Sequence, residues 1–489
     1  MTQSLNFRSK AFGYLASAFV TGIAFAGHAA DSKTIIHVDL DSNQTKAHNQ
    51  LQTLKKMDVL GVNLKQHWAE VAVTNEELSQ LKAEHLPIRI AESLLNKLTV
   101  SVSPDKYLNP KQVVQALTTI NSQYPSITKL FEVGKTHQQR SMMAIEISAH
   151  VDDTDKPVIL FNAMHHAREV MTTEVVMHIA KVLTENYGKD PEVTNWLDQY
   201  RIVLVPQVNP DGNAIVSSSD TMWRKNAYEL NGDVVGVDLN RNYSAYWNYC
   251  DGSSDYPDSE IYRGPSAGSE PETQAMMNLV STYKPVADIS YHSYSELIIY
   301  PFGCSKVENP SKDLFHAISQ AMNKKIRDDD NKTNAYAIGT APELLYEADG
   351  SDIDWLWKEQ GVLAFCIEVN SSSFHPDYKK WRDVTVQRQE GGWQTILRRM
   401  AQSGFRAHIQ TSIPNEVSYS LKKIEGKQKI AFDTDAPDRT FTLRSTSGLL
   451  YQLTEKGRYE VTIFVNNQPV KSLTIDVGDT LVDLGDIAI

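Results

Sequence analysis

Residues 157–169 read PVILFNAMHHARE, an apolar run that ends in a His-x-x-Glu pair. The apolar part is typical of a strand that is buried on both faces of a sheet. An imidazole and a carboxylate three residues apart can face one point and bind a metal, although such pairs are common in sequences of any kind. Arg168, between them, carries a planar fork of donors that suits carboxylate or carbonyl oxygens. The stretch therefore indicates a metal site only if other segments supply a third ligand, a base and substrate-binding groups.

Two later apolar runs end in residues of the same chemical kind. Residues 286–292 end in His292, and the run 362–369 carries Glu368 near its end. In open α/β sheets, ligands bind outside the carboxyl ends of the strands, so we expect these motifs to meet in one crevice. One glutamate and two histidines would give a three-ligand zinc site with an open position for water.

Residues 104–404 alternate apolar strand signals with long helical patterns. We expect strands at 142–149, 157–163, 201–208, 286–292 and 362–369. We expect helices at 110–123, 170–187, 269–283, 311–327, 352–360 and 385–402. Strand runs without polar alternation, separated by helices, favour an α/β sandwich with a mostly parallel or mixed sheet.

The segments on either side of this region predict smaller domains. In residues 31–103 we expect strands at 35–40, 69–73 and 87–90, a helix at 43–57, and a second helix capped by Asn75. This α+β domain is interpreted as a propeptide that folds over the site, with a permanent accessory domain as the alternative. Residues 405–489 show short alternating stretches at 439–443, 459–465 and 471–475, with a turn signal at 466–469. They predict a β-sandwich accessory domain.

The first 30 residues predict a secretory signal peptide. Arg8 and Lys10 precede an apolar stretch from Ala11 to Ala26, and small residues follow up to Ala30. We expect cleavage between Ala26 and Asp31 and export of the protein, either to a periplasm or to the medium. An uncleaved membrane anchor is the alternative, although the apolar run is short for a span.

Composition restricts the partners and the redox environment. The chain has 48 basic and 60 acidic residues, a net charge of 48 − 60 = −12, or 46 − 60 = −14 without the signal. That balance argues against nucleic acid as a partner, because phosphate binding needs clustered positive charge. Past the signal no 18-residue apolar run occurs, so no membrane span is expected in the mature chain. The three cysteines allow at most one disulfide, and Cys250 with Cys304 is favoured because Cys366 lies in a strand that looks buried.

Eight motifs in order give the sequence a more specific resemblance. They are His166-Ala167-Arg168-Glu169, Trp223-Arg224-Lys225-Asn226, Gly236-Val237-Asp238-Leu239-Asn240-Arg241-Asn242, His292-Ser293-Tyr294-Ser295, Tyr300-Pro301-Phe302-Gly303, Leu345-Tyr346-Glu347-Ala348, Ile353-Asp354-Trp355 and Ile367-Glu368. From about residue 107 to residue 402 the chain resembles the zinc metallocarboxypeptidases of the carboxypeptidase A/B type, the funnelins. The resemblance implies their fold, a mixed eight-stranded sheet sandwiched by helices.

The resemblance also implies a role for each residue near the metal. One Zn²⁺ per chain would be held by His166, Glu169 and His292, while His165 would not be a ligand. Asp238 would orient His166 through its other ring nitrogen. Glu368 would be the general base, and Arg224 would stabilise the developing oxyanion.

A second group of residues is implied in substrate binding. Asn240 and Arg241 would grip the terminal carboxylate of the substrate, Arg241 through a bidentate charged fork. Tyr346 would close over the bound terminus, and Arg168 and Tyr294 would contact the substrate beside it.

Ile353 occupies the position that, in this family, forms the floor of the pocket for the C-terminal side chain. An aliphatic floor favours aromatic or aliphatic residues, whereas basic specificity would need an acid. Asp349 and Asp352 lie nearby in sequence, and an inward-turned Asp352 would also allow Lys or Arg.

The sequence is therefore interpreted as a zinc-dependent exopeptidase that releases C-terminal residues from peptides or proteins with a free C-terminus. A hydrolase of cell-wall peptides on the same fold is the nearest alternative. A catalytically inactive binding module is the alternative from another class.

Overall fold

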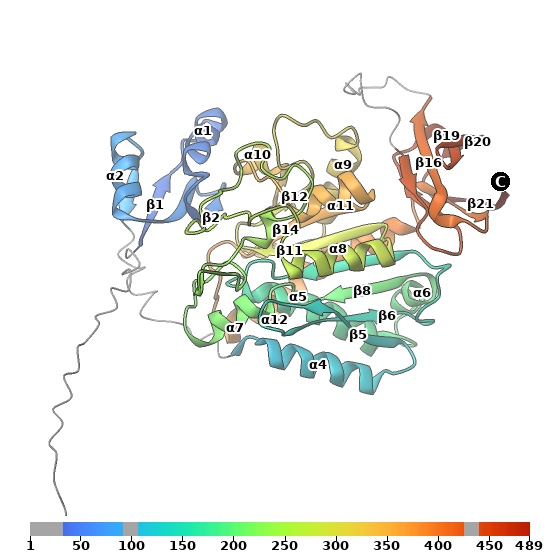
Figure 1. Cartoon of the computed structure of the whole chain (residues 1–489), viewed down its shortest axis with the longest axis horizontal. Helices are drawn as coiled ribbons and strands as arrows, with labels where there is room; N and C mark the ends of the chain where they lie inside the picture. Colours follow the sequence, from blue (N-terminus) through green and yellow to red (C-terminus); the bar gives the residue numbers. More distant parts are fainter. Residues whose placement is uncertain (1–32, 91–105, 425–439) are drawn as a thin grey trace, which may run out of the picture.

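The computed structural model describes residues 33–90, 106–424 and 440–489. The predicted signal peptide and residues 91–105 and 425–439 lie outside the described residues. Figure 1 shows a central region of helices and sheet, with the N-terminal part at one end and the C-terminal strands at the other. Within the described ranges, no helix has the length and apolarity needed to cross a bilayer.

The N-terminal part, residues 33–90, is a four-stranded antiparallel sheet with two helices. Its elements are β1 (Thr34–Asp39), α1 (Gln44–Leu54), β2 (Asp58–Asn63), β3 (Trp68–Val73), α2 (Asn75–Ala83) and β4 (Ile88–Ile90), and the strand order is β2-β3-β1-β4. The predicted helix was too long and β2 was not foreseen. Helix α1 ends at Leu54, and the chain begins to pair with β3 at Asp58.

The cap of α2 corrects one prediction. Thr74, and not Asn75, caps the helix: its hydroxyl accepts from the N–H of Glu77 at 3.2 Å. The Glu77 carboxylate in turn accepts the N–H of Thr74 at 2.7 Å. This reciprocal pair satisfies two backbone donors at once, which a cap at Asn75 could not do with the same glutamate.

The central region carries the predicted mixed eight-stranded sheet. Its strands are β5 (Thr128–Lys135), β6 (Ser141–Ile147), β7 (Val158–Ala163), β8 (Arg201–Val205), β11 (Ala287–Ser293), β12 (Leu297–Ile299), β13 (Ala337–Gly339) and β14 (Leu363–Val369), in the order β13-β12-β14-β11-β7-β8-β6-β5. Neighbours from β14 to β8 run parallel, whereas β6 and β5 run antiparallel. The fold class predicted from the sequence is confirmed.

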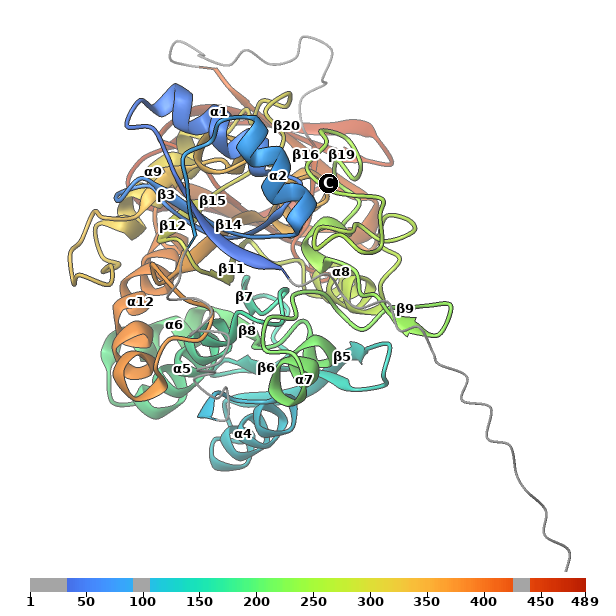
Figure 2. The same cartoon turned by 90° about the vertical axis from the view of Figure 1, so that its left-hand side faces the viewer.

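Helices cover both faces of this sheet (Figures 1 and 2). They are α4 (Pro110–Gln123), α5 (Val170–Asn186), α6 (Pro191–Gln199), α7 (Pro210–Ser218), α8 (Pro271–Tyr283), α9 (Lys312–Asn323), α10 (Ala341–Leu344), α11 (Asp352–Gln360) and α12 (Tyr378–Met400). Alternate residues of β14 enter opposite layers: Phe365 and Ile367 pack in one apolar core, Ala364 and Cys366 in the other. Burial of both faces explains the unbroken apolar run in the sequence.

Helix α12 begins at Tyr378, seven residues before its predicted start. The Asp377 side chain accepts from the N–H of Lys380 at 2.8 Å and so caps the helix. Tyr378 and Trp381 in this first turn are three residues apart and pack against the core, so the apolar spacing extends to this start and the prediction overlooked it.

The C-terminal part forms two packed sheets, as predicted. Its strands are β15 (Gly404–Gln410), β16 (Val417–Lys423), β17 (Thr440–Thr442), β18 (Leu449–Leu453), β19 (Gly457–Val465), β20 (Gln468–Val477) and β21 (Leu481–Ala488), ordered β18-β15-β21 and β17-β16-β19-β20. Its buried residues belong to the same apolar core as those of the central helices. The sandwich is therefore packed onto the central region and not suspended from it.

Candidate active site

The predicted strand-end motifs do meet in space. Strands β7, β11 and β14 are parallel neighbours, and His292 lies directly opposite Glu368 in the register of the last two. Parallel strands in register bring their carboxyl ends to one edge of the sheet. The loop after β7 brings His166 and Glu169 to the same edge, where they line one cavity with His292 and Glu368.

Three of these side chains converge on one point. Nδ1 of His166 lies 2.7 Å from Oε1 of Glu169 and 3.2 Å from Nδ1 of His292. Nδ1 of His292 lies 3.1 Å from Oε2 of Glu169. Glu169 is the residue that precedes α5, and its carboxylate is directed to the two imidazoles. All three are buried.

This donor set fits a zinc ion. Two imidazole nitrogens and a carboxylate within 4.8 Å of one another match the ligands of catalytic zinc sites in type and number. Nε2 of His166 lies 3.2 Å from Oδ1 of Asp238, which leaves Nδ1 to face the cluster. Three protein ligands keep one coordination position open for water or substrate.

Asp238 links the cluster to Arg224. Its Oδ2 accepts from Nη2 of Arg224 at 2.9 Å and from Nε at 3.2 Å. Burial acts to raise the pKa of Asp238, but the charges of Arg224 and His166 outweigh burial and hold this pKa well below its usual range. Asp238 is therefore ionised and fixes the His166 ring and the Arg224 guanidinium together.

Glu368 is a carboxylate in the same cavity as the cluster. It lies partly buried on β14. Burial and the nearby charge of Glu169 raise the pKa of Glu368 to about 7. A carboxylate with a raised pKa is a stronger base than one in open solvent.

Asn240 and Arg241 follow Asp238 on a short 3₁₀ turn and line the cavity. The Arg241 guanidinium donates from Nε to the carbonyl of Gly252 at 2.9 Å and from Nη1 to the carbonyl of Asn240 at 2.8 Å. The side chain is thus held rigidly. Tyr346 faces the same cavity, and burial raises the pKa of its phenol.

The other predicted substrate contacts are covered by the N-terminal part. Arg168 is buried, with Nη2 2.8 Å from Oδ1 of Asp58, and its guanidinium lies over the Phe374 ring. The Tyr294 hydroxyl donates to Glu70 on β3. Asp58 and Glu70 were not foreseen, because neither residue belongs to a motif that links it to the active-site residues.

Strand β2 itself enters the cavity. Residues Val59 to Val62 line it, and the N–H of Val62 donates to the Ser295 hydroxyl at 3.0 Å. A Cβ at Gly61 would overlap the Tyr294 ring, so a glycine is required there. With β2 in place, the cavity retains about 90 Å³. Figure 2 shows the N-terminal part lying across the region of β11 and β14.

Ile353, which was expected to form the floor of the specificity pocket, lines the cavity, as do Cys366 and Ala348. Asp349 is the first of the two acids nearby. It accepts the N–H groups of Tyr249 and Cys250 at 3.0 Å, so its carboxylate holds the loop that contains these two residues. Asp352 lines the cavity.

The predicted disulfide is confirmed. Cys250 and Cys304 are bonded, and among the described residues Cys366 is the one unpaired cysteine. The bond ties the loop that holds Arg241 to the segment after β12.

His165 is adjacent to the cluster, but its ring nitrogen contacts Tyr243 and not the three clustered side chains. Its Nε2 lies 2.9 Å from the Tyr243 hydroxyl, and its ring stacks on His292 with 5.6 Å between centroids. Burial lowers the pKa of His165 to about 4, so its ring is neutral.

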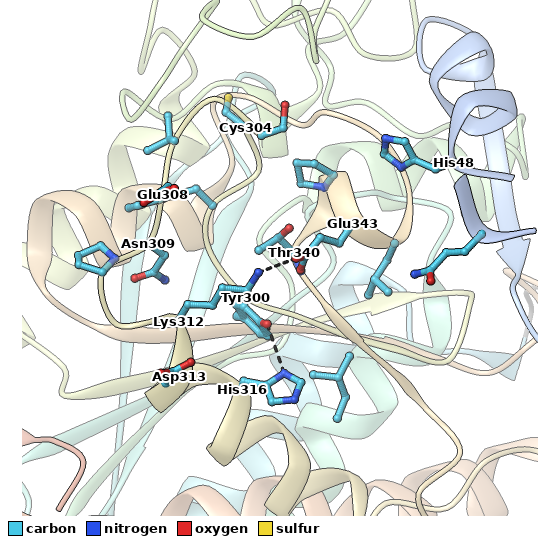
Figure 3. Close-up of a pocket in the computed structure, with 18 of the residues that line it drawn as sticks. His48, Tyr300, Cys304, Glu308, Asn309, Lys312, Asp313, His316, Thr340 and Glu343 are labelled. Carbon is cyan, nitrogen blue, oxygen red and sulfur yellow. Dashed lines mark hydrogen bonds and ion pairs between the residues drawn. The ribbon is translucent and has the colours of Figure 1, made fainter. Parts of the chain in front are cut away.

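A larger cleft of about 1180 Å³ lies outside the site (Figure 3). It is lined by His48 of α1, by the segment after β12 and by Lys423 of the sandwich. Ion pairing of Lys312 with Glu343 and a 3.4 Å contact between Tyr300 and His316 cross it. It contains none of the cluster residues.

Comparisons with known proteins agree with this geometry. Carboxypeptidase A2 of Rattus norvegicus is 29% identical over 277 residues, which cover 55% of this chain and 64% of that protein. A metallocarboxypeptidase A-like protein of Trichophyton verrucosum is 31% identical over 281 residues, covering 55% and 63%. The chain thus spans less than two thirds of the length of these relatives. The crystal structure of carboxypeptidase A from Helicoverpa armigera superimposes with a TM-score of 0.64 at 22% identity, covering 75% of this chain and 96% of that one.

The family comparison covers the region that carries the site. The model described as zinc carboxypeptidase matches residues 113–387, more than half of the chain, and this range includes His166, Glu169, His292, Asp238 and Glu368. The chain belongs to the zinc carboxypeptidase family.

Proposed function

We propose that the protein is a metallocarboxypeptidase, a zinc-dependent exopeptidase that releases C-terminal residues from peptides. The observation that supports this most is the shared cavity of the His166–Glu169–His292 cluster, Glu368 and Arg241. It combines a metal site, a base and a carboxylate-binding cation. Peptides and proteins with a free C-terminus are the expected partners, and the net charge of −12 argues against nucleic acid.

Zinc, when bound, would polarise the scissile carbonyl and lower the pKa of water. His166, Glu169 and His292 would hold it. Glu368 would accept a proton from the attacking water and pass it to the leaving amine nitrogen. Arg224, ionised and buried beside Asp238, would donate to the oxygen that gains negative charge.

Exopeptidase action needs a cation at a fixed distance from the reacting carbonyl. Arg241, anchored by the carbonyls of Gly252 and Asn240, supplies such a cation, and Asn240 lies beside it. Two parallel N–H donors from an arginine bind a terminal carboxylate with defined geometry. Binding there would orient the last peptide bond, and Tyr346, Arg168 and Tyr294 would contact the substrate around it.

The C-terminal residue that the enzyme releases is proposed to have a hydrophobic side chain. Ile353 and Cys366 present apolar or weakly polar surface to the cavity, and such a surface favours aromatic or aliphatic groups. Acceptance of Lys or Arg as well would depend on Asp352.

We further propose that residues 31–103 are a propeptide. Arg168, Tyr294 and the cavity itself are engaged by Asp58, Glu70 and β2, so a substrate cannot occupy them. Cleavage after residue 90 would release this part and open the site. Export fits the predicted signal and the Cys250–Cys304 bond, because disulfides persist in oxidising compartments.

Peptide turnover before and after limited proteolysis tests the function. The cleaved chain should release single C-terminal residues, seen by mass spectrometry, and a chelator should stop it until zinc is restored. Peptides ending in Phe and Leu should be preferred over those ending in Arg or Glu. Cleavage of peptides with an amidated C-terminus at the same rate would contradict exopeptidase action.

A further inference from the structure

The two histidines of the metal cluster differ in the hydrogen-bond partner of the ring nitrogen that faces away from the cluster. His166 presents Nδ1 to the cluster and has Asp238 beside Nε2. His292 also presents Nδ1 to the cluster, 3.1 Å from Glu169. Its Nε2 is buried and has no hydrogen-bond partner among the described residues. A metal-binding imidazole almost always donates its other N–H to a carboxylate, a carbonyl or a water molecule, so a partner is expected here.

Asp352 has the complementary unpaired atom. Its Oδ1 accepts the N–H of Ile353 at 2.8 Å, whereas Oδ2 is buried and has no hydrogen-bond partner in the described ranges. The ligand atoms of Asp352, His165 and His292 all lie within 4.8 Å of one another. Leaving both a buried acceptor and a buried donor unpaired is unfavourable, because each has given up its hydrogen bonds to water.

The position of Asp352 is fixed by its backbone. It is the first residue of α11, and its N–H donates to Oδ1 of Asn240 at 2.9 Å. His165 lies 3.8 Å from Oδ2 but already contacts the Tyr243 hydroxyl at 2.9 Å. The ring of His165 lies parallel to that of His292 within 12° and so closes one side of the group. The acid therefore faces the imidazole pair and is anchored at the helix start.

We propose that Asp352 is a positioning residue of the metal centre, whose Oδ2 accepts the Nε2–H of His292 through one bridging water molecule, or directly after a small shift of the side chain. This inference rests on the proposed function, because it takes His292 as a zinc ligand. Each histidine would then have its own carboxylate, Asp238 for His166 and Asp352 for His292. The carboxylate fixes the tautomer and the ring orientation of His292 and makes Nδ1 a better donor. Asp352 is then not the acid that would bind a basic C-terminal side chain.

Zinc affinity of the uncleaved chain tests this without relying on turnover. Dissociation constants are measured by competition with a chromophoric chelator for the native chain, Asp352→Asn and Asp354→Asn. Asp354→Asn is the control, because it removes a carboxylate from the same helix turn. The Asp354 carboxylate accepts the N–H of Gly303 and does not contact a histidine in the described part of the chain. Asp352→Asn should weaken zinc binding by about 10- to 100-fold, and Asp354→Asn should change it by less than about twofold. The visible spectrum of the cobalt-substituted protein should shift in Asp352→Asn alone.

Other outcomes would overturn the inference. Unchanged zinc affinity in Asp352→Asn would do so, as would equal weakening in both variants. Loss of turnover on Arg-ended peptides with unchanged zinc affinity would assign Asp352 to the specificity pocket instead. A native chain that binds no zinc would overturn the proposed function itself.

If Asp352→Asn does not fold, the crystal structure of the zinc-loaded native chain decides. A hydrogen bond between Oδ2 and Nε2, or one bridging water, supports the inference. A carboxylate turned into the substrate cavity contradicts it.

Discussion

At the scale of single residues, Glu368 is the group on which the proposed chemistry depends. Glu368→Gln keeps the shape of the side chain but removes its ability to accept a proton. Turnover should fall by at least about 10²- to 10⁴-fold, the usual contribution of general acid–base catalysis. The measurement is kcat on a C-terminal Phe peptide, with zinc content as the control. Full activity with normal zinc content would contradict the mechanism.

Arg241 gives a prediction about the carboxylate of the substrate. Arg241→Ala should lower kcat/KM on peptides with a free C-terminus by roughly 10- to 150-fold, since hydrogen bonds between charged groups contribute about 1.5–3 kcal/mol. The matched substrate is the same peptide with an amidated terminus, on which native and variant protein should differ little. If Arg241→Ala lowers kcat/KM equally on both substrates, Arg241 does not recognise the terminal carboxylate.

At the scale of elements, β2 is the strand that closes the cavity, and Gly61 is its point of closest approach. Gly61→Val would place methyl groups against the Tyr294 ring, and overpacking of this kind costs about 1–3 kcal/mol. The uncleaved variant should therefore show roughly 5- to 150-fold more turnover than the uncleaved native chain.

The control for Gly61→Val is Gly478→Val, because the space around Gly478 is open. After proteolytic removal of the N-terminal part, Gly61→Val and native protein should be equally active. Equal activity before cleavage as well would show that β2 does not block the site.

At the scale of the whole molecule, the N-terminal part is held by a buried ion pair whose strength depends on pH. Burial acts to raise the pKa of Asp58, but Arg168 and Lys33 outweigh burial and lower it to about 2. The folded pKa lies below the unfolded value, so the stabilisation is present above pH 4 and is lost as pH falls through about 2. The shift corresponds to about 2 kcal/mol.

Acid should therefore loosen the N-terminal part. Cleavage by pepsin between residues 90 and 106 should accelerate as pH falls from 4 to 2. In Asp58→Asn this particular pH dependence should be absent, because the titrating group is gone. An identical pH profile in native protein and variant would assign the effect to other carboxylates.

The sandwich is joined to the central region by Arg444. Its buried guanidinium donates to the carbonyls of Pro285, Gln360 and Gly361 at 2.7–3.1 Å. Arg444→Met leaves these acceptors unpaired, and we expect a loss of about 2–4 kcal/mol in the free energy of unfolding, measured in urea.

Arg406→Met is the control for Arg444→Met. Arg406 pairs with Asp483 on an exposed surface, where such pairs contribute at most about 1 kcal/mol. Equal losses in the two variants would mean that Arg444 does not join the sandwich to the core.

The central strands β6, β7, β8, β11 and β14 could be predicted because their signals are local. The run 362–369 is apolar at every position that the sheet buries, and the helix at 110–123 carries its own start signal, Asn109 followed by Pro110. Strand β2 was not foreseen, because Gly61 interrupts the short apolar run of Asp58-Val-Leu-Gly-Val-Asn63 and a glycine weakens a strand signal. Its structure depends on pairing with β3 and on the surface that it covers.

The sequence by itself determined the family, the sheet class and the order of the motifs, because residue types at fixed spacings carry that information. Only the tertiary structure decided what faces what: that Arg168 and Tyr294 meet Asp58 and Glu70, and that Asp352 lies beside two imidazoles. These contacts join residues from about 60 to more than 220 positions apart. No local pattern encodes such pairs, since they depend on how packed elements bring distant side chains to one edge of the sheet.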